Sequence, residues 1–371
     1  MQVSDVTTIG LIILLVIVIG YAVVGDTNYI TERTTEEGEH VTMTDMFEPL
    51  PNLGKAGRLV GISDWINTGP IANEDLRGKV VMVDFWTYSC VNCIRTLPFL
   101  QGWHEKYKDN GFLLLGVHAP EFEFEKDLAN VQTAVDKYGL TYPVGIDNDH
   151  RTWNSFKNRF WPAHYLIDVD GNLRFVHFGE GKYAETDAAI DSLLVEAGLR
   201  SADGELPDAE AETAQEPPEP RTAETYLGYL RLNNFGDPAA DIVPDEPYTF
   251  SSPEELTPDR FYLNGEWSIH PEFAQTVSDT GGELIFSYQG KELNLVMDAP
   301  TGPIEVEVLL DGKPLTPKAA GGDITRRGGK SFVTVEQSRL YGLVDQSESD
   351  RHTLELRIPA AQVRLFAFTF G

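Results

Sequence analysis

Hydrophobic residues are unevenly distributed along the chain, and the longest uncharged run lies near the N-terminus. Residues 6–25 form a stretch of 20 residues without a charge, dense in Leu, Ile and Val. At the helical rise, 20 residues span about 30 Å, the thickness of a bilayer core. The pattern therefore predicts a transmembrane anchor at residues 1–25. A cleaved signal peptide is the alternative, but no Lys or Arg precedes the run, and it is long for a signal core.

Two polar segments divide the rest of the chain. Residues 26–44 are polar and acidic, which predicts a tether. Residues 201–222 contain four prolines and seven acidic residues and almost nothing that a core could bury, which predicts a semi-rigid linker. The two remaining segments, residues 45–200 and 223–371, are each long enough to form a domain.

In residues 45–200, short apolar runs alternate with segments of helical periodicity. Strands alternating with helices, then a hairpin and a last helix, predict an α/β domain with a central mixed sheet covered on both faces. The predicted strands are Val80–Trp86, Phe112–Val117, Tyr142–Ile146, Ala163–Asp168 and Leu173–Phe178. The predicted helices are Val91–Lys108, Glu125–Tyr138, Thr152–Asn158 and Ala184–Ala197.

Residues 223–371 have a different pattern, in which short alternating runs recur between Gly, Asp and Pro residues. Asp311-Gly312 follows one run as a turn signal. Many short strands at this spacing predict an all-β sandwich that resembles a jelly roll. The predicted strands are Phe261–Ile269, Glu283–Tyr288, Leu293–Met297, Ile304–Leu310, Ser331–Val335, Arg351–Ile358 and Val363–Phe370.

The charge balance narrows the class of partner. The chain has 29 Lys and Arg against 58 Asp and Glu, which gives a formal net charge of −29. Proteins that grip phosphate backbones carry the opposite sign, so we expect no nucleic-acid partner.

The two cysteines, Cys90 and Cys93, are three residues apart where a predicted buried strand gives way to a helix. A cysteine at a helix N-terminus meets unpaired N–H groups and the positive end of the dipole, which favour the thiolate and lower the pKa. Cys93, one turn further on, can attack a mixed disulfide formed by Cys90. The alternatives are inert thiols or half a zinc site, but no second pair of ligands stands out among the eight His. We therefore predict redox chemistry that needs no metal and no bound cofactor.

Around these cysteines the sequence resembles the thioredoxin superfamily. Asp84–Trp86 matches the thioredoxin DFW motif, and Pro98 falls eight residues after Cys90, where thioredoxins kink the active-site helix. Arg159–Asp168 resembles the segment in which a cis-proline faces the cysteines. The resemblance implies a thioredoxin fold over most of residues 45–200.

The resemblance also implies roles for individual residues. Cys90 would be the attacking thiol and Cys93 the resolving thiol of a redox-active disulfide. Asp84 would be the buried carboxylate that deprotonates Cys93, and burial would suit it to this by raising its pKa. Pro162 would be cis, with the Trp161 backbone pairing with an extended substrate. Trp86 would pack near the site as a third candidate substrate-binding residue, with core filling as the alternative.

A finer similarity is to membrane-tethered envelope reductases of the TlpA and ResA type and to the redoxin region of DipZ-type proteins. It rests on Phe85–Cys93, on Gly116–Glu121 and on Phe178–Gly181. Envelope reductases carry an acid near Glu121 that tunes the cysteine pair, which makes Glu121 a candidate, although Glu123 and Glu125 compete with it.

The similarity to DipZ-type chains also predicts the partners of this protein. DipZ-type chains also carry a multi-helix electron-importing membrane domain. With one apolar span here, we expect a separate membrane electron donor and a protein disulfide or dithiol as substrate. Thioredoxins have Gly-Pro between the cysteines where this chain has Val91-Asn92, so the oxidising or reducing direction stays open.

Two other functions remain open at this point. The stretch Phe261–Trp267 resembles the start of the carbohydrate-binding-module-like domain that follows DipZ-type redoxins. Trp267, Tyr288 and Tyr341 would then stack on a sugar, although sandwich aromatics more often belong to the core. The chain would in that case be an envelope adaptor for glycan or protein. A thiol peroxidase is the other option, since Thr87 precedes Cys90 by three as in peroxiredoxins, but Val83 stands where their motif has Pro.

Overall fold

The computed structural model describes residues 49–201, 221–237, 242–277, 281–360 and 362–371. Residues 49–371 form one compact unit. The predicted anchor at 1–25, the tether at 26–44 and most of the predicted linker lie outside the described residues. Over the described ranges, no helix is both long and apolar enough to cross a membrane.

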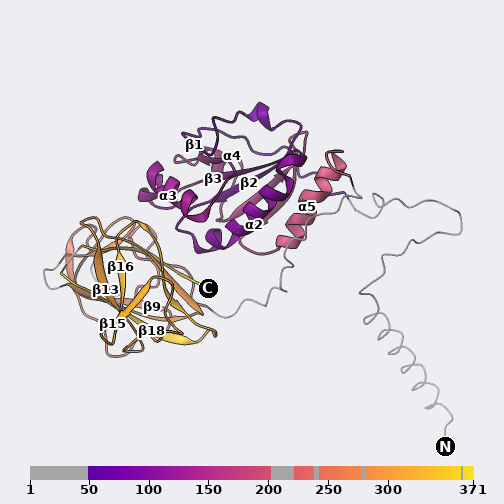
Figure 1. Cartoon of the computed structure of the whole chain (residues 1–371). Helices are drawn as coiled ribbons and strands as arrows, with labels where there is room; N and C mark the ends of the chain where they lie inside the picture. Colours follow the sequence, from indigo (N-terminus) through magenta and orange to yellow (C-terminus); the bar gives the residue numbers. More distant parts are fainter. Residues whose placement is uncertain (1–48, 202–220, 238–241, 278–280, 361) are drawn as a thin grey trace, which may run out of the picture. The chain divides into compact units, whose positions relative to one another are not determined.

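The first part of the unit is an α/β domain built on a six-stranded mixed sheet with the order β1-β4-β3-β2-β5-β6 (Figure 1). Strands β2, β3 and β4 run parallel, whereas β1, β5 and β6 pair antiparallel with their neighbours. The strands are β1 (Trp65–Ile66), β2 (Val80–Trp86), β3 (Phe112–His118), β4 (Val144–Ile146), β5 (Ala163–Ile167) and β6 (Leu173–Phe178). The helices are η2 (Asn73–Leu76), α2 (Val91–Tyr107), η3 (Lys108–Asn110), η4 (Glu123–Lys126), α3 (Leu128–Tyr138), α4 (Arg151–Ser155) and α5 (Tyr183–Glu196).

Successive side chains of β2 point alternately into two different hydrophobic cores. Val80, Met82 and Trp86 belong to the core shared with α2, α3 and α5. Val81, Val83 and Phe85 belong to a second core on the other face, with Trp153 of α4 and Phe156 just after it as the main partners. Successive side chains of a strand point to opposite faces. Asp84 therefore lies on the α2 face, the same face as Cys93.

The predicted helix 125–138 begins later than expected. A 3-10 turn, η4, occupies Glu123–Lys126, and α3 begins at Leu128. The reason is a stronger cap, because the Asp127 side chain accepts a hydrogen bond of 2.8 Å from the N–H of Ala129. The other predicted helices and strands of this domain are present, with bounds that differ by a few residues at most.

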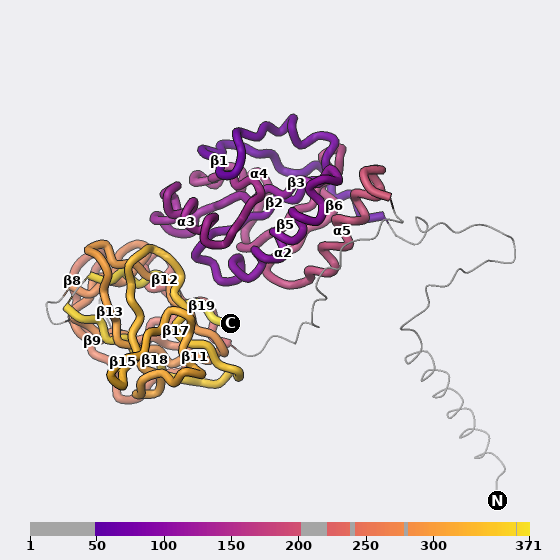
Figure 2. The backbone as a smooth tube through the Cα atoms, viewed as in Figure 1, coloured from indigo at the N-terminus to yellow at the C-terminus, as the bar shows by residue number. Residues whose placement is uncertain are grey.

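The described residues from Arg221 onward form an all-β region, as predicted. Hydrogen bonding joins its strands into one 13-stranded sheet rather than two separately bonded sheets. Figure 2 shows the chain of this region winding around a common centre. The strands are β7 (Thr225–Tyr226), β8 (Pro247–Phe250), β9 (Arg260–Ile269), β10 (Ala274–Thr276), β11 (Gly282–Gln289), β12 (Glu292–Asp298), β13 (Ile304–Leu310), β14 (Lys313–Pro314), β15 (Ile324–Arg327), β16 (Lys330–Val335), β17 (Arg339–Asp345), β18 (Arg351–Ile358) and β19 (Arg364–Phe370).

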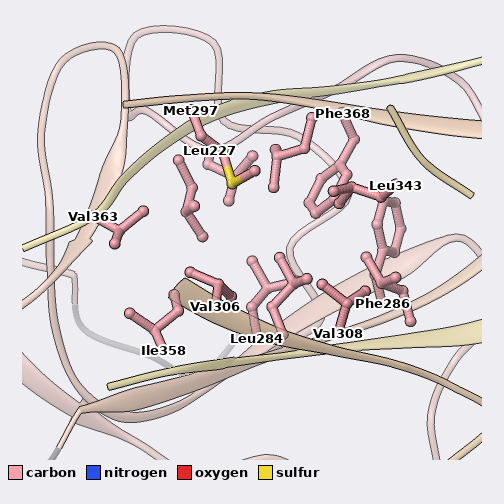
Figure 3. Close-up of a cluster of buried hydrophobic side chains, with 14 of the residues drawn as sticks. Leu227, Leu284, Phe286, Met297, Val306, Val308, Leu343, Ile358, Val363 and Phe368 are labelled. Atoms are coloured by element: carbon pink, nitrogen blue, oxygen red, sulfur yellow. The ribbon is translucent and has the colours of Figure 1, made fainter. Parts of the chain in front are cut away.

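A single hydrophobic core fills the interior of this sheet. Figure 3 shows side chains converging from two sides, with Met297, Leu343 and Phe368 facing Leu284 and Val308. The predicted turn closes the β13–β14 hairpin, since Asp311 and Gly312 have φ values of 52° and 72°. Left-handed backbone at both central positions is what a tight hairpin turn requires, and Asp and Gly tolerate it.

Candidate active site

Cys90 is the N-cap residue of α2, as the sequence predicted. Its backbone is extended, and its Sγ accepts a hydrogen bond of 3.2 Å from the N–H of Cys93. This contact satisfies one of the N–H groups that the first helical turn leaves unpaired. Together with the positive end of the helix dipole, it stabilises a negative charge on the Cys90 sulfur.

The two cysteines differ in accessibility. Both are free thiols; Cys90 is partly exposed, whereas Cys93 is fully buried. Burial raises the pKa of Cys93 well above its usual range, and the hydrogen bond to Cys90 and the charge of Cys90 add to the effect. An incoming disulfide therefore meets Cys90 first, while Cys93 stays protonated beneath it.

Asp84 acts electrostatically on Cys93 and lies directly opposite His164. The two residues are register partners on β2 and β5, and both are buried. Nδ1 of His164 is 2.9 Å from Oδ1 of Asp84, although the contact lacks hydrogen-bond geometry and the carboxylate oxygens have no other partner. The charge of Asp84 contributes to the raised pKa of Cys93. The structure thus brings Asp84 into electrostatic reach of the resolving thiol, and it adds His164, which the sequence analysis did not select.

The candidate substrate-binding residues lie around a cis peptide bond. The Trp161-Pro162 bond is cis, as the resemblance implied. Trp161 is half-buried, its Nε1 donates a hydrogen bond of 3.0 Å to the carbonyl of Ala119, and its ring packs against Trp153. Trp86 is fully buried, so it serves the core rather than a surface that a substrate could reach.

His118 ends β3 beneath the segment that leads to Cys90. Its Nε2 lies 3.3 Å from Oγ1 of Thr87, and its ring stacks on Tyr88. Burial, with a smaller contribution from the charge of His150, lowers the pKa of His118 to about 3. His118 is therefore neutral at physiological pH and acts as a packing and hydrogen-bonding group.

The three acidic candidates after β3 have separate surroundings. The carboxylate of Glu121 accepts hydrogen bonds from Tyr226 Oη at 2.7 Å and from Arg231 at 2.6 Å. Glu123 is exposed, with 74% of its side chain accessible. Glu125 is fully buried and contacts Ser89, the residue before Cys90. A signal for its burial was present, because Glu125 lies close to two phenylalanines and is three residues after the residue that caps η4.

The comparisons with known proteins match the two domains separately. Residues 64–176 match the AhpC/TSA family, and residues 222–371 match the family described as thioredoxin like C-terminal domain. Protein DipZ of Mycobacterium bovis is 36% identical over 330 residues, which cover 87% of this chain. The thiol-disulfide oxidoreductase YkuV of Bacillus subtilis is 28% identical over 150 residues, or 40% of this chain and 96% of YkuV. The chain therefore combines a thioredoxin-like redoxin domain with a thioredoxin like C-terminal domain.

The matched regions cover different shares of this chain and of its relatives. The matched part makes up 44% of DipZ, so this chain spans less than half the length of that relative. A solution structure of a thioredoxin-like protein in the oxidised form covers 38% of this chain and 96% of its own, with 28% identity and a TM-score of 0.36. The similarity to YkuV and to the AhpC/TSA family makes the redoxin domain a member of the thiol-disulfide oxidoreductase class, as predicted.

The aromatic residues proposed to stack on a sugar do not form a surface. Trp267, Tyr288 and Tyr341 are all completely buried in the core of the all-β region. The three rings occupy inward-facing positions of β9, β11 and β17, where large aromatic side chains bury the most apolar surface. The prediction that they bind a glycan is wrong, and the alternative, that they are core residues, is correct.

The all-β region also contributes to the surroundings of the redoxin site through Tyr226 and Arg231. Arg231 packs its guanidinium over the rings of Tyr226 and Phe122, besides its ion pair with Glu121.

No group of three or more His, Cys, Asp or Glu in the described ranges is arranged to hold a metal ion.

Proposed function

We propose that this protein is a membrane-anchored thiol-disulfide oxidoreductase that exchanges disulfides with extracytoplasmic proteins through Cys90 and Cys93. The observation that carries the proposal is the asymmetry of the pair. Cys90 is partly exposed and accepts the N–H of Cys93, whereas Cys93 is buried one turn further into α2. This arrangement gives one thiol for attack and a second for release.

The exchange takes place in two displacements. The Cys90 thiolate attacks one sulfur of a substrate disulfide, which forms a mixed disulfide and releases the other substrate sulfur as a thiolate. Cys93 then gives its proton to Asp84 and attacks Cys90 Sγ. This second step forms the Cys90–Cys93 disulfide and frees the substrate as a dithiol, so two electrons pass from the enzyme to the substrate. The reverse sequence oxidises a substrate dithiol.

Asp84 is suited to the proton transfer because it lies on the α2 face of β2, and its charge acts on Cys93. Trp161 and Pro162 would bind the segment of the substrate that carries the disulfide, with the Trp161 backbone as the pairing edge. Glu121 is a candidate for tuning the pair from the loop after β3.

The proposed location rests on the uncharged run at residues 6–25. A single helix of that length would hold the redoxin domain at the membrane, and stable disulfides for exchange occur outside the cytoplasm. Reduction of substrates in that compartment requires a supply of electrons, which we assign to a separate membrane protein that would reduce the Cys90–Cys93 disulfide.

Trapping of the mixed disulfide tests the proposal. In a Cys93→Ser variant of the full chain, release is blocked, so Cys90 should accumulate mixed disulfides with envelope proteins that run as reducible bands on a non-reducing gel. A Cys90→Ser variant is the matched control and should trap none, because Cys93 is buried. An unreactive Cys90 in the Cys93→Ser variant contradicts the proposal.

A further inference from the structure

Glu125 is a buried carboxylate that joins two loops beside the cysteine pair. Its Oε1 accepts hydrogen bonds from Oγ of Ser89 at 2.6 Å and from the backbone N–H of Ser89 at 3.3 Å. Its Oε2 accepts the backbone N–H groups of Glu121 at 2.5 Å and of Phe122 at 3.0 Å. One side chain therefore holds the segment before Cys90 against the loop after β3.

The four donors fit the ionised form of the Glu125 carboxylate better than the protonated form. An ionised carboxylate is an acceptor only and offers about four lone-pair sites, whereas a protonated carboxyl must also donate one hydrogen bond. Three of the donors are backbone N–H groups that cannot turn into acceptors. A proton on Glu125 therefore weakens at least one bond of the set, although hydroxyl groups such as Ser89 Oγ can reverse their role.

Opposing influences bring the pKa of Glu125 close to neutral pH. Burial, followed by the negative charge of Glu121, raises the pKa of Glu125 to about 7, while the donors act in the other direction. Two titratable groups act directly on the carboxylate or are acted on by it: Tyr88, from the segment after β2, and Glu121, from the loop after β3. Glu121 is in turn bonded to Tyr226 and Arg231 and lies within electrostatic reach of Glu224.

We propose that Glu125 is a positioning residue for Cys90, and that its ionised form holds the attacking sulfur in place more firmly than its protonated form. The proposal rests on the proposed thiol-disulfide exchange. Ser89 immediately precedes the N-cap of α2, so the two bonds to Ser89 fix the point from which Cys90 presents its sulfur to the N–H of Cys93. A looser segment gives a less well stabilised thiolate and a slower attack.

The test compares the reactivity of Cys90 with and without an ionisable group at position 125. All variants carry Cys93→Ser in the full chain, so that Cys90 is the only thiol, and the probe is 2,2′-dithiodipyridine, a small neutral disulfide. We measure the rate constant of the reaction from pH 5 to 9 and take the ratio of the parent to the Glu125→Gln variant at each pH. This ratio removes the part of the thiol titration that the two proteins share, and leaves the part that depends on Glu125.

We expect the ratio to be close to one below pH 6 and to rise about threefold to tenfold above pH 8, the effect of about one net hydrogen bond. The midpoint of the rise should lie near pH 7. Ser89→Ala removes a donor to the ionised form and should move the midpoint of the rise to higher pH. Glu121→Gln removes a repelling charge and should move it to lower pH.

Glu123→Gln is the matched control, since Glu123 lies on the same short helix but is exposed. It should leave the profile unchanged. A ratio that does not vary with pH, or a midpoint that Ser89→Ala and Glu121→Gln leave in place, overturns the proposal. If Cys90 fails to react in every variant at every pH, the proposed exchange itself is wrong, and that result is distinct from a flat ratio.

Discussion

Nδ1 of His164 lies 2.9 Å from Oδ1 of Asp84, with both side chains buried on adjacent strands of the sheet. The ring of His164 stacks on that of His177 at a centroid distance of 5.8 Å, and His177 is only half-buried. The carboxylate predicted to take the proton of Cys93 therefore has a second titratable side chain beside it. This arrangement makes the release step sensitive to the charge at position 84.

Replacement of Asp84 by Asn should slow release without preventing capture. Asn keeps the size of the side chain but cannot accept the Cys93 proton, and a positioned general base contributes about 10²–10⁴-fold to a step of this kind. We expect the mixed disulfide to accumulate even though both cysteines are present. Acid quenching followed by alkylation and gel analysis measures it. Rapid release by Asp84→Asn, at the rate of the parent chain, contradicts the assigned role.

Glu125 should make the stability of the protein fall as pH rises through the neutral range. Its pKa is about 7 in the folded protein against an ordinary value of 4.5, so the folded state binds more protons between these values. Between pH 5 and pH 8, the parent should lose about 2–3 kcal/mol of unfolding free energy relative to Glu125→Gln. Urea unfolding of both proteins at the two pH values measures the difference. An equal difference at both pH values contradicts the raised pKa.

His118 should make the stability of the protein fall as pH decreases. Its pKa is lowered to about 3 from 6.5, so the unfolded state binds the proton first, and the stability of the neutral buried form is lost as pH falls below 6.5. His118→Gln should be destabilised at pH 8, because it loses the stacking on Tyr88. At pH 5 this deficit should be smaller by about 2 kcal/mol. A deficit that stays constant between these pH values indicates that His118 titrates normally.

Local patterns were enough to predict the redoxin core and the position of the cysteines. The run Val80–Trp86 became β2 with the predicted bounds, and the helix that follows begins at Val91, directly after Cys90. These features depend on neighbours in sequence, on the composition of a buried strand and on the cap of one helix. The thioredoxin motifs then fixed the order of the remaining elements.

Contacts across strands and loops were not predictable in the same way. His164 meets Asp84 because β5 pairs with β2 in one particular register, which neither segment encodes by itself. The sequence held only a local signal for Glu125, its place three residues after the residue that caps η4, and the inward direction of its carboxylate depends on how the η4 turn folds. In the all-β region, alternation located β9 and β11 but could not tell whether Tyr288 faces the core or a ligand.

Two glycines in the redoxin domain should respond to alanine in opposite directions. Gly116 on β3 pairs with Asp84, and a Cβ there would lie 3.0 Å from the ring of Tyr142 and 3.1 Å from Nε1 of Trp86. Both rings are fully buried and have little room to move, so Gly116→Ala should destabilise the protein by about 1–3 kcal/mol. Overpacking beside Asp84 should also slow release of the mixed disulfide.

Gly102 supplies the matched control, because it lies on the exposed face of α2 with no atom within 4 Å of an added Cβ. Gly102→Ala should stabilise the helix by about 0.5–1 kcal/mol, since alanine loses less backbone entropy on folding. Thermal unfolding of the two variants and the rate of release give both readouts. If Gly116→Ala is as stable as the parent, the packing around Asp84 is looser than these contacts require, and its carboxylate would be open to water rather than reserved for Cys93.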